Sequence, residues 1–105
     1  MTDRPTLPAD LLRVIAAMPE ADLARLFEDL LTDAERGQLT ERWAIVCHLV
    51  AGESQRSVRD LVGAGVSTVN RGARQLKYGA GGFQRAFETL VDLGLPDPRT
   101  PKALK

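Results

Sequence analysis

Apolar residues recur along this chain at spacings of three and four, which is the period of an α-helix. No segment shows the alternation of apolar and polar residues, enriched in β-branched side chains, that is typical of a half-buried strand. The sequence therefore predicts an all-α fold.

Two short amphipathic helices are expected first. One starts after Pro8 and stops before Pro19, and the other follows at once. Thr32, with Glu35 three residues later, has the spacing of a capping box and predicts a third helix from Asp33. The residues expected to face inward are Leu11, Leu12, Ile15 and Met18 in the first helix, and Leu23, Leu26, Phe27, Leu30 and Leu31 in the second.

The third helix, from Asp33 to about Ala51, is expected to be a central buried rod, because residues 43–50 are apolar almost all round. A second copy of so small a chain would supply part of the cover, so a homodimer is expected. Cys47 and His48 are interpreted as structural residues of this rod.

Three further helices are predicted. Gly52 ends the rod, and Ser54 caps the fourth helix. Residues 63–65 then interrupt the helical pattern before the fifth helix begins. The last helix is expected from about Gly82 to Leu93. The apolar positions are Val58, Leu61 and Val62 in the fourth helix; Val66, Val69 and Leu76, turned inward, in the fifth; and Phe83, Phe87, Leu90 and Val91, a buried edge, in the last.

The segment from Ser54 to Tyr78 matches a helix-turn-helix, in which Gly63 supplies the turn and small valines lock the two helices together. Charge supports this interpretation. Residues 54–78 carry five basic residues against one acidic residue, a net of +4, whereas residues 1–41 carry four against nine, a net of −5. A basic stretch in a neutral protein is typical of a DNA-binding site, although a solvated helix face is the alternative.

Composition excludes several classes of protein. No apolar run approaches the roughly 18 residues of a membrane span, and the first residues lack the pattern of an export signal, so a cytoplasmic protein without membrane contact is expected. One cysteine and one histidine are too few for a structural zinc site. No nucleophile lies at a recognisable spacing from a base, so neither a catalytic residue nor an enzyme is expected.

The turn and its flanks carry a specific resemblance. The chain resembles the bacterial tryptophan operon repressors at residues 31–36, at Arg42, at residues 54–56, from Gly63 to Gly72, and at residues 76–77. The resemblance implies an intertwined homodimer of six-helix subunits that represses transcription at operator DNA with L-tryptophan as corepressor. Independently of the resemblance, the prolines after Leu95 cannot continue a helix, so we expect a helix-turn-helix domain over residues 1–95 and a flexible C-terminal tail over residues 96–105.

Residues for both sites follow from the resemblance. Arg42 and Arg71 would sandwich the indole, Arg71 and Thr32 would hold the carboxylate, and carbonyls near Leu31 of the partner chain would receive the ammonium group. The expected ligand-binding residues are Leu31, Thr32, Arg42, Thr68, Arg71, Gly72 and Gln75. The expected DNA-binding residues are Gln55, Arg56, Arg59, Val66, Ser67, Asn70, Arg74 and Lys77, with Arg56 contacting a base directly.

The chain departs from the family's pattern in three places. It lacks one residue before Ser54, it carries Gln75 where well-known members have a serine near the ligand's ammonium group, and Asn70 and residues 78–83 resemble a sister group of repressor-like proteins. The alternative function is therefore a regulator of the same fold that binds no ligand, or another aromatic amino acid or indole derivative. A rival from another class is a protein-interaction module whose basic face binds an acidic partner.

Overall fold

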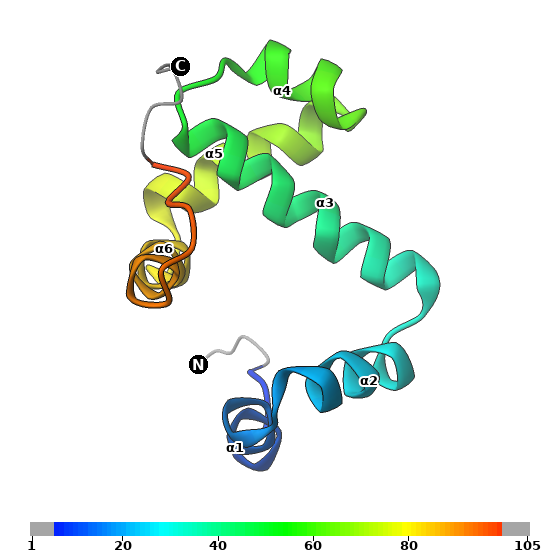
Figure 1. The fold of residues 1–105 in the computed structure, drawn as a ribbon. Coiled ribbons are helices and arrows are strands. Elements are labelled where there is room, and N and C mark those ends of the chain that lie inside the picture. Colours follow the sequence, from blue (N-terminus) through cyan, green and yellow to red (C-terminus); the bar gives the residue numbers. More distant parts are fainter. Residues whose placement is uncertain (1–5, 100–105) are drawn as a thin grey trace, which may run out of the picture. The chain divides into compact units, whose positions relative to one another are not determined.

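The computed structural model describes residues 6–99, and within that range it contains helices and no strand (Figure 1). The prediction of an all-α fold with six helices is confirmed. The helices are α1 (Ala9–Ala17), α2 (Glu20–Leu30), α3 (Asp33–Val50), α4 (Gln55–Val62), α5 (Val66–Tyr78) and α6 (Gly82–Asp92). The chain divides into two compact units, Met1–Arg36 and Gly37–Lys105.

The N-terminal unit begins and ends its helices where the sequence predicts. Pro8 and Pro19 directly precede α1 and α2, since a proline ring suits a helix start. The predicted capping box is present. The Glu35 backbone N–H donates to Thr32 Oγ1 at 3.1 Å, and the Thr32 N–H donates to Glu35 Oε1 at 2.9 Å. This reciprocal pair fixes the start of α3.

No described residue of α1 or α2 is buried within the chain. Leu12 and Leu30, which were expected to face inward, are each 50% exposed. That expectation is wrong for the single chain, because two short helices cannot cover one another's apolar faces completely. Arg36 Nη1 ties the end of α2 to the start of α3 by donating to the carbonyls of Glu28, at 3.1 Å, and Leu31, at 2.8 Å.

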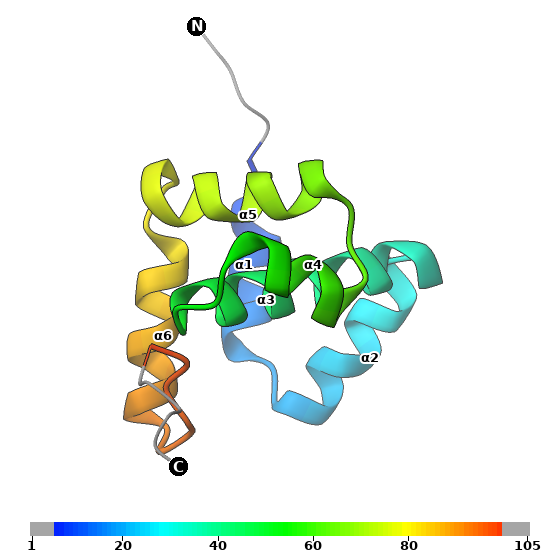
Figure 2. The same ribbon diagram turned by 90° about the horizontal axis from the view of Figure 1, so that it is seen from above.

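The core of the C-terminal unit joins α3, α4 and α5. Ile45, Val58 and Val69, one from each helix, form a buried cluster. The half-buried residues Leu49, Val62 and Ala64 pack against this cluster. Burying one such aliphatic side chain contributes roughly 1.5–3 kcal/mol, so the cluster holds α4 and α5 on the end of α3. Figure 2 shows these helices together, with α6 leaving the end of α5.

The helix-turn-helix has the predicted caps. Ser54 Oγ accepts a hydrogen bond from the Ser57 N–H at 3.1 Å and so starts α4. Gly63 ends α4 with φ +78°, a left-handed conformation that costs glycine little. The Glu53 carboxylate links the end of α3 to α4, because one oxygen lies 2.8 Å from His48 Nδ1 and the other accepts from the Ser57 hydroxyl at 3.3 Å.

An aromatic cluster attaches α6 to α3. Phe87 is fully buried, and its ring centroid lies 5.8 Å from that of Trp43 and 6.5 Å from that of Phe83. Arg99, which pairs with Asp97, lies over the Phe87 ring at 5.9 Å. Part of the segment after α6 therefore packs on the helix. Residues 100–105 of the expected flexible tail lie outside the described residues.

Two other expectations about burial need correction. Val66 was expected to lock the helix-turn-helix but is 54% exposed, because it is the first residue of α5 and Val69, one turn later, occupies the core. Val91 is 50% exposed and is not part of the buried edge of α6. Within the single chain the rod buries only Ile45 and Val46, and Trp43 is 40% exposed. The cover expected from a second copy stays a prediction.

Over residues 6–99, the structure contains no helix of the length and apolarity that crossing a membrane requires. Within the same residues, no group of three or more His, Cys, Asp or Glu side chains is placed so that it could hold a metal ion.

Candidate ligand cavity and nucleic-acid interface

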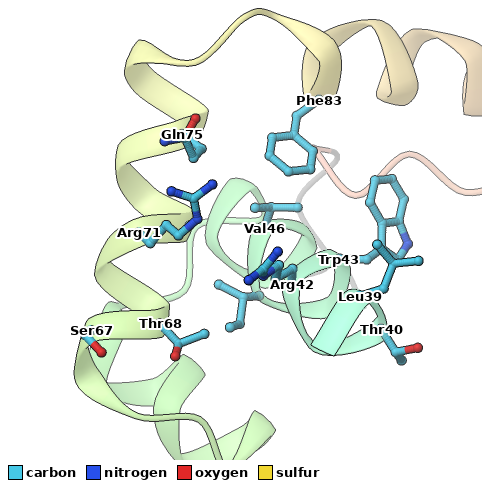
Figure 3. Close-up of a pocket in the computed structure, with 12 residues that line it drawn as sticks. Leu39, Thr40, Arg42, Trp43, Val46, Ser67, Thr68, Arg71, Gln75 and Phe83 are labelled. Carbon is cyan, nitrogen blue, oxygen red and sulfur yellow. The ribbon is translucent and has the colours of Figure 1, made fainter. Parts of the chain in front are cut away.

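A cavity of about 870 Å³ lies between α3 and α5. Each helix lines it with one face, since the contributing positions follow the i, i+3, i+4, i+7 spacing of a single helical stripe. The residues are Leu39, Arg42, Trp43 and Val46 from α3 and Thr68, Arg71, Gly72 and Gln75 from α5, joined by Thr40, Ile45, Ser67 and Phe83. Figure 3 shows the Arg42 and Arg71 side chains reaching into this space from the two opposite helices.

The cavity combines an apolar wall with two positive charges. Among the described residues that line it, Arg42 and Arg71 carry the only formal charges, and no carboxylate is present. Guanidinium groups both stack on aromatic rings and donate paired hydrogen bonds to a carboxylate. The cavity is therefore chemically suited to a small ligand with an aromatic ring and an anionic group.

Gly72 brings the two walls of the cavity together. A Cβ atom placed at this position would lie 2.7 Å from Ile45 Cγ2, closer than real Cβ contacts come. Ile45 is 1% exposed and β-branched, so its methyl group has little freedom to move away. Glycine at this position sets the distance between α5 and α3.

Five of the seven residues expected to bind ligand line this one cavity: Arg42, Thr68, Arg71, Gly72 and Gln75. The other two, Leu31 and Thr32, belong to the N-terminal unit and do not line it. Thr32 Oγ1 accepts the capping hydrogen bond of α3, and the Leu31 carbonyl accepts one from Arg36.

Two aromatic residues of the cavity were missed in the sequence. Trp43 was interpreted as part of the buried rod and Phe83 as the edge of the last helix, but both line the cavity. The sequence could have indicated Trp43, because this residue follows Arg42 directly and lies on the same helical face as Leu39, four residues earlier. Trp43, Phe83 and Gln75 also line a second cavity of about 390 Å³ beside residues 79–82, so they stand between the two.

The residues expected to contact DNA lie on the helix-turn-helix, and most of them are exposed. Arg59 is half-buried. The exposed ones are Gln55 and Arg56 on α4, and Val66, Ser67, Asn70, Arg74 and Lys77 on α5. Tyr78, which the sequence interpretation left out, is 70% exposed at the end of α5.

The cations of the helix-turn-helix have no acidic partner in the described part of the chain. Ion pairs there involve Arg25, Arg36, His48, Arg85 and Arg99 and none of the basic residues of α4 or α5. Their charge is thus available to a polyanion.

Together, the caps, the glycine turn and the valine core define a small all-helical protein of the helix-turn-helix class. A ligand-sized cavity lies against the second helix of the motif. A family model described as Trp repressor protein matches residues 9–91. The chain belongs to the Trp repressor family.

Individual relatives agree with this assignment. A Trp operon repressor homolog of Photobacterium profundum is 40% identical over 70 residues, which are 66% of this chain and 66% of that protein. A homolog of Vibrio campbellii is 36% identical over 66 residues, 62% of this chain and 66% of the relative. A homolog of Vibrio atlanticus is 45% identical over 49 residues, 46% of this chain and 50% of the relative. The chain thus spans between half and about two thirds of these relatives' length, and no solved structure matches it.

Proposed function

We propose that this protein is a transcriptional repressor that binds operator DNA as a homodimer, with L-tryptophan as corepressor. One observation carries the proposal. Helix α5 presents Asn70, Arg74 and Lys77 on its exposed side and lines the cavity with Thr68 and Arg71 on another. A ligand in the cavity would therefore touch the helix that enters the major groove, and could set its orientation.

The chemistry of the cavity supports an aromatic amino acid. The guanidinium planes of Arg42 and Arg71, which reach in from opposite helices, suit stacking on the two faces of an indole ring. Arg71 would also hold the carboxylate, Thr68 faces the same space, and the lack of a side chain at Gly72 leaves room beside the ring. Thr32 and carbonyls near Leu31 would join the site from the partner chain.

Exposed apolar side chains support the dimer. Leu12, Leu30 and Leu39 are each 50–52% exposed, on α1, α2 and α3. A second copy that covers such residues would bury the apolar surface that the single chain leaves in water. Two helix-turn-helix heads in one dimer would then contact half-sites one DNA turn apart.

Calorimetric titration of the purified protein with L-tryptophan tests the ligand. We expect saturable binding at one site per chain, and loss of that binding in Arg71→Ala. Arg74→Ala is the matched control, since it removes an arginine one turn further along α5 that does not line the cavity. Absence of binding by a folded dimer, or equal losses in the two variants, would contradict the corepressor assignment.

The contacts with DNA require a separate variant. Arg56 is exposed on α4, and we assign it a direct base contact. Because a good base contact contributes about 1–3 kcal/mol of discrimination, Arg56→Ala should weaken specific binding by roughly five- to 150-fold without changing the affinity for the ligand. If Arg56→Ala instead lost affinity for the ligand and kept its preference for the operator sequence, Arg56 would be assigned to the ligand site and not to DNA. We propose no catalytic role for any residue.

A second candidate function rests on Gln75. This side chain is half-buried and lines both cavities, where its carboxamide narrows the space beside α5. A regulator of the same fold that takes another aromatic amino acid or an indole derivative, or no ligand, fits this feature. Titration with indole-3-propionate, which lacks the ammonium group, distinguishes the candidates: binding of this compound without binding of tryptophan favours the second.

A further inference from the structure

Tyr78 ends α5 with its aromatic ring largely in water, since the residue is 70% exposed. Two cations lie against this ring. Arg74 Cζ is 5.7 Å from the ring centroid and Lys77 Nζ is 5.8 Å from it. Both distances are within the roughly 6 Å range of a cation–π interaction. The ring is therefore the common partner of two exposed positive charges.

Free arginine and lysine side chains occupy many rotamers, and fixing either one in a complex costs entropy. A ring that already holds the side chain reduces that cost. A guanidinium group stacked on a ring keeps the N–H donors of its edge free, so Arg74 can hold the ring and a phosphate oxygen together. The ammonium group of Lys77 has three donors, and contact with the ring leaves some of them available.

We propose that Tyr78 is a positioning residue for DNA binding: its ring gathers Arg74 and Lys77 at the end of α5 and presents them to the phosphates that flank the major groove. The inference rests on the proposed function, because it requires that α5 binds DNA. The phosphate backbone is the partner that fits two closely spaced cations with no acidic partner in the described part of the chain.

The test uses the full-length protein and a labelled 30-base-pair duplex of mixed sequence at about 50 mM salt, because binding without sequence preference depends almost entirely on phosphate contacts. Tyr78→Phe keeps the ring and removes the hydroxyl, whereas Tyr78→Leu removes both. Val91→Ala is the control for loss of an exposed apolar side chain. Sedimentation of each variant checks the oligomeric state, and proton NMR of the free protein checks the ring contact itself.

We expect Tyr78→Leu to weaken binding about two- to fivefold for each helix-turn-helix head, the range of an exposed cation–π contact, and Tyr78→Phe to bind like the natural protein. In a chain that already carries Arg74→Ala and Lys77→Ala, Tyr78→Leu should have no further effect. The NMR signals of the Arg74 and Lys77 side chains should show ring-current shifts that Tyr78→Leu abolishes.

Three results would overturn the inference. Equal losses in Tyr78→Phe and Tyr78→Leu would assign the effect to the hydroxyl group, and unchanged binding in Tyr78→Leu would leave the ring without a role. A dissociated dimer in Tyr78→Leu would make the ring part of an interface between copies. If the natural protein shows the ring-current shifts but does not bind the duplex either with or without saturating L-tryptophan, the proposed function itself fails, and this inference fails as its consequence.

Discussion

Replacement of Gly72 by alanine tests the link between the fold and the cavity. The new methyl group would lie 2.7 Å from Ile45 Cγ2, and 3.7 Å from both Leu49 Cδ1 and Val46 Cγ1. Only the first contact is too short. Because an ordinary contact begins near 3.4 Å, α5 or the buried Ile45 side chain must move by several tenths of an ångström. That movement would separate the helices that form the cavity.

Gly37 provides a matched control. It also lies inside a helix, α3, but a Cβ atom there would meet nothing within 4 Å. Replacing a helical glycine with alanine stabilises a helix by about 1 kcal/mol, and overpacking a core costs typically 1–3 kcal/mol. Gly37→Ala should therefore raise the free energy of unfolding by up to about 1 kcal/mol, while Gly72→Ala should lie about 1–3 kcal/mol below it.

Urea denaturation of both variants at one chain concentration measures this difference, since the stability of a dimer depends on concentration. Ligand titration of Gly72→Ala should also show weaker binding, because the clash with Ile45 changes the spacing of the two helices that line the cavity. Equal free energies of unfolding for Gly72→Ala and Gly37→Ala, with ligand affinity unchanged, would refute the close approach at Gly72.

Three further predictions concern single side chains. Ser54→Ala removes the cap of α4 and should lower the free energy of unfolding by about 1 kcal/mol in urea denaturation, whereas Ser67→Ala, which removes no cap, should be close to neutral; similar losses would contradict the assigned cap. Gln75→Ser should widen the cavity and tighten tryptophan binding in calorimetry by roughly tenfold, the scale of one side-chain mismatch in a pocket, and weaker binding would show that the carboxamide helps the ligand. Burial raises the pKa of the Cys47 thiol, so less thiolate is present at pH 8 and alkylation by iodoacetamide should be several-fold slower in the folded protein than in urea; equal rates would contradict this shift.

The helix ends were predictable because local residues fix them. The prolines before α1 and α2, the Thr32 capping box, the Ser54 cap and the left-handed Gly63 all act within a few residues of their position. Each of these helix ends could therefore be predicted from the neighbouring residues alone. The bounds of the helices accordingly agree with the prediction to within about one residue.

Burial was less predictable because it depends on neighbours in space. Val66 has the same side chain as Val69 and lies on the same helix, yet Val66 is 54% exposed and Val69 is fully buried. The difference comes from the path of α5 over Ile45 and Val58, which spacing along one helix does not specify. The burial of Leu12, Leu30 and Val91 was misjudged for the same reason.

The candidate cavity was predictable only in part. Its polar and small members, such as Arg71 and Gly72, belong to a run that resembles one family, so their association was expected. Trp43 and Phe83 belong to α3 and α6, and only the folded chain brings them beside Gln75. The sequence also did not indicate the positioning role that we propose for Tyr78, because its contacts depend on the rotamers of Arg74 and Lys77.

The most direct test of the central claim is selection of DNA from a pool of random duplexes by the purified protein, with and without L-tryptophan. We expect enrichment of a two-fold symmetric sequence whose half-sites lie one helical turn apart, about 10 base pairs, and only when tryptophan is present. Equal enrichment without tryptophan would contradict its role as corepressor. A pool that stays unenriched under both conditions would contradict sequence-specific DNA binding itself.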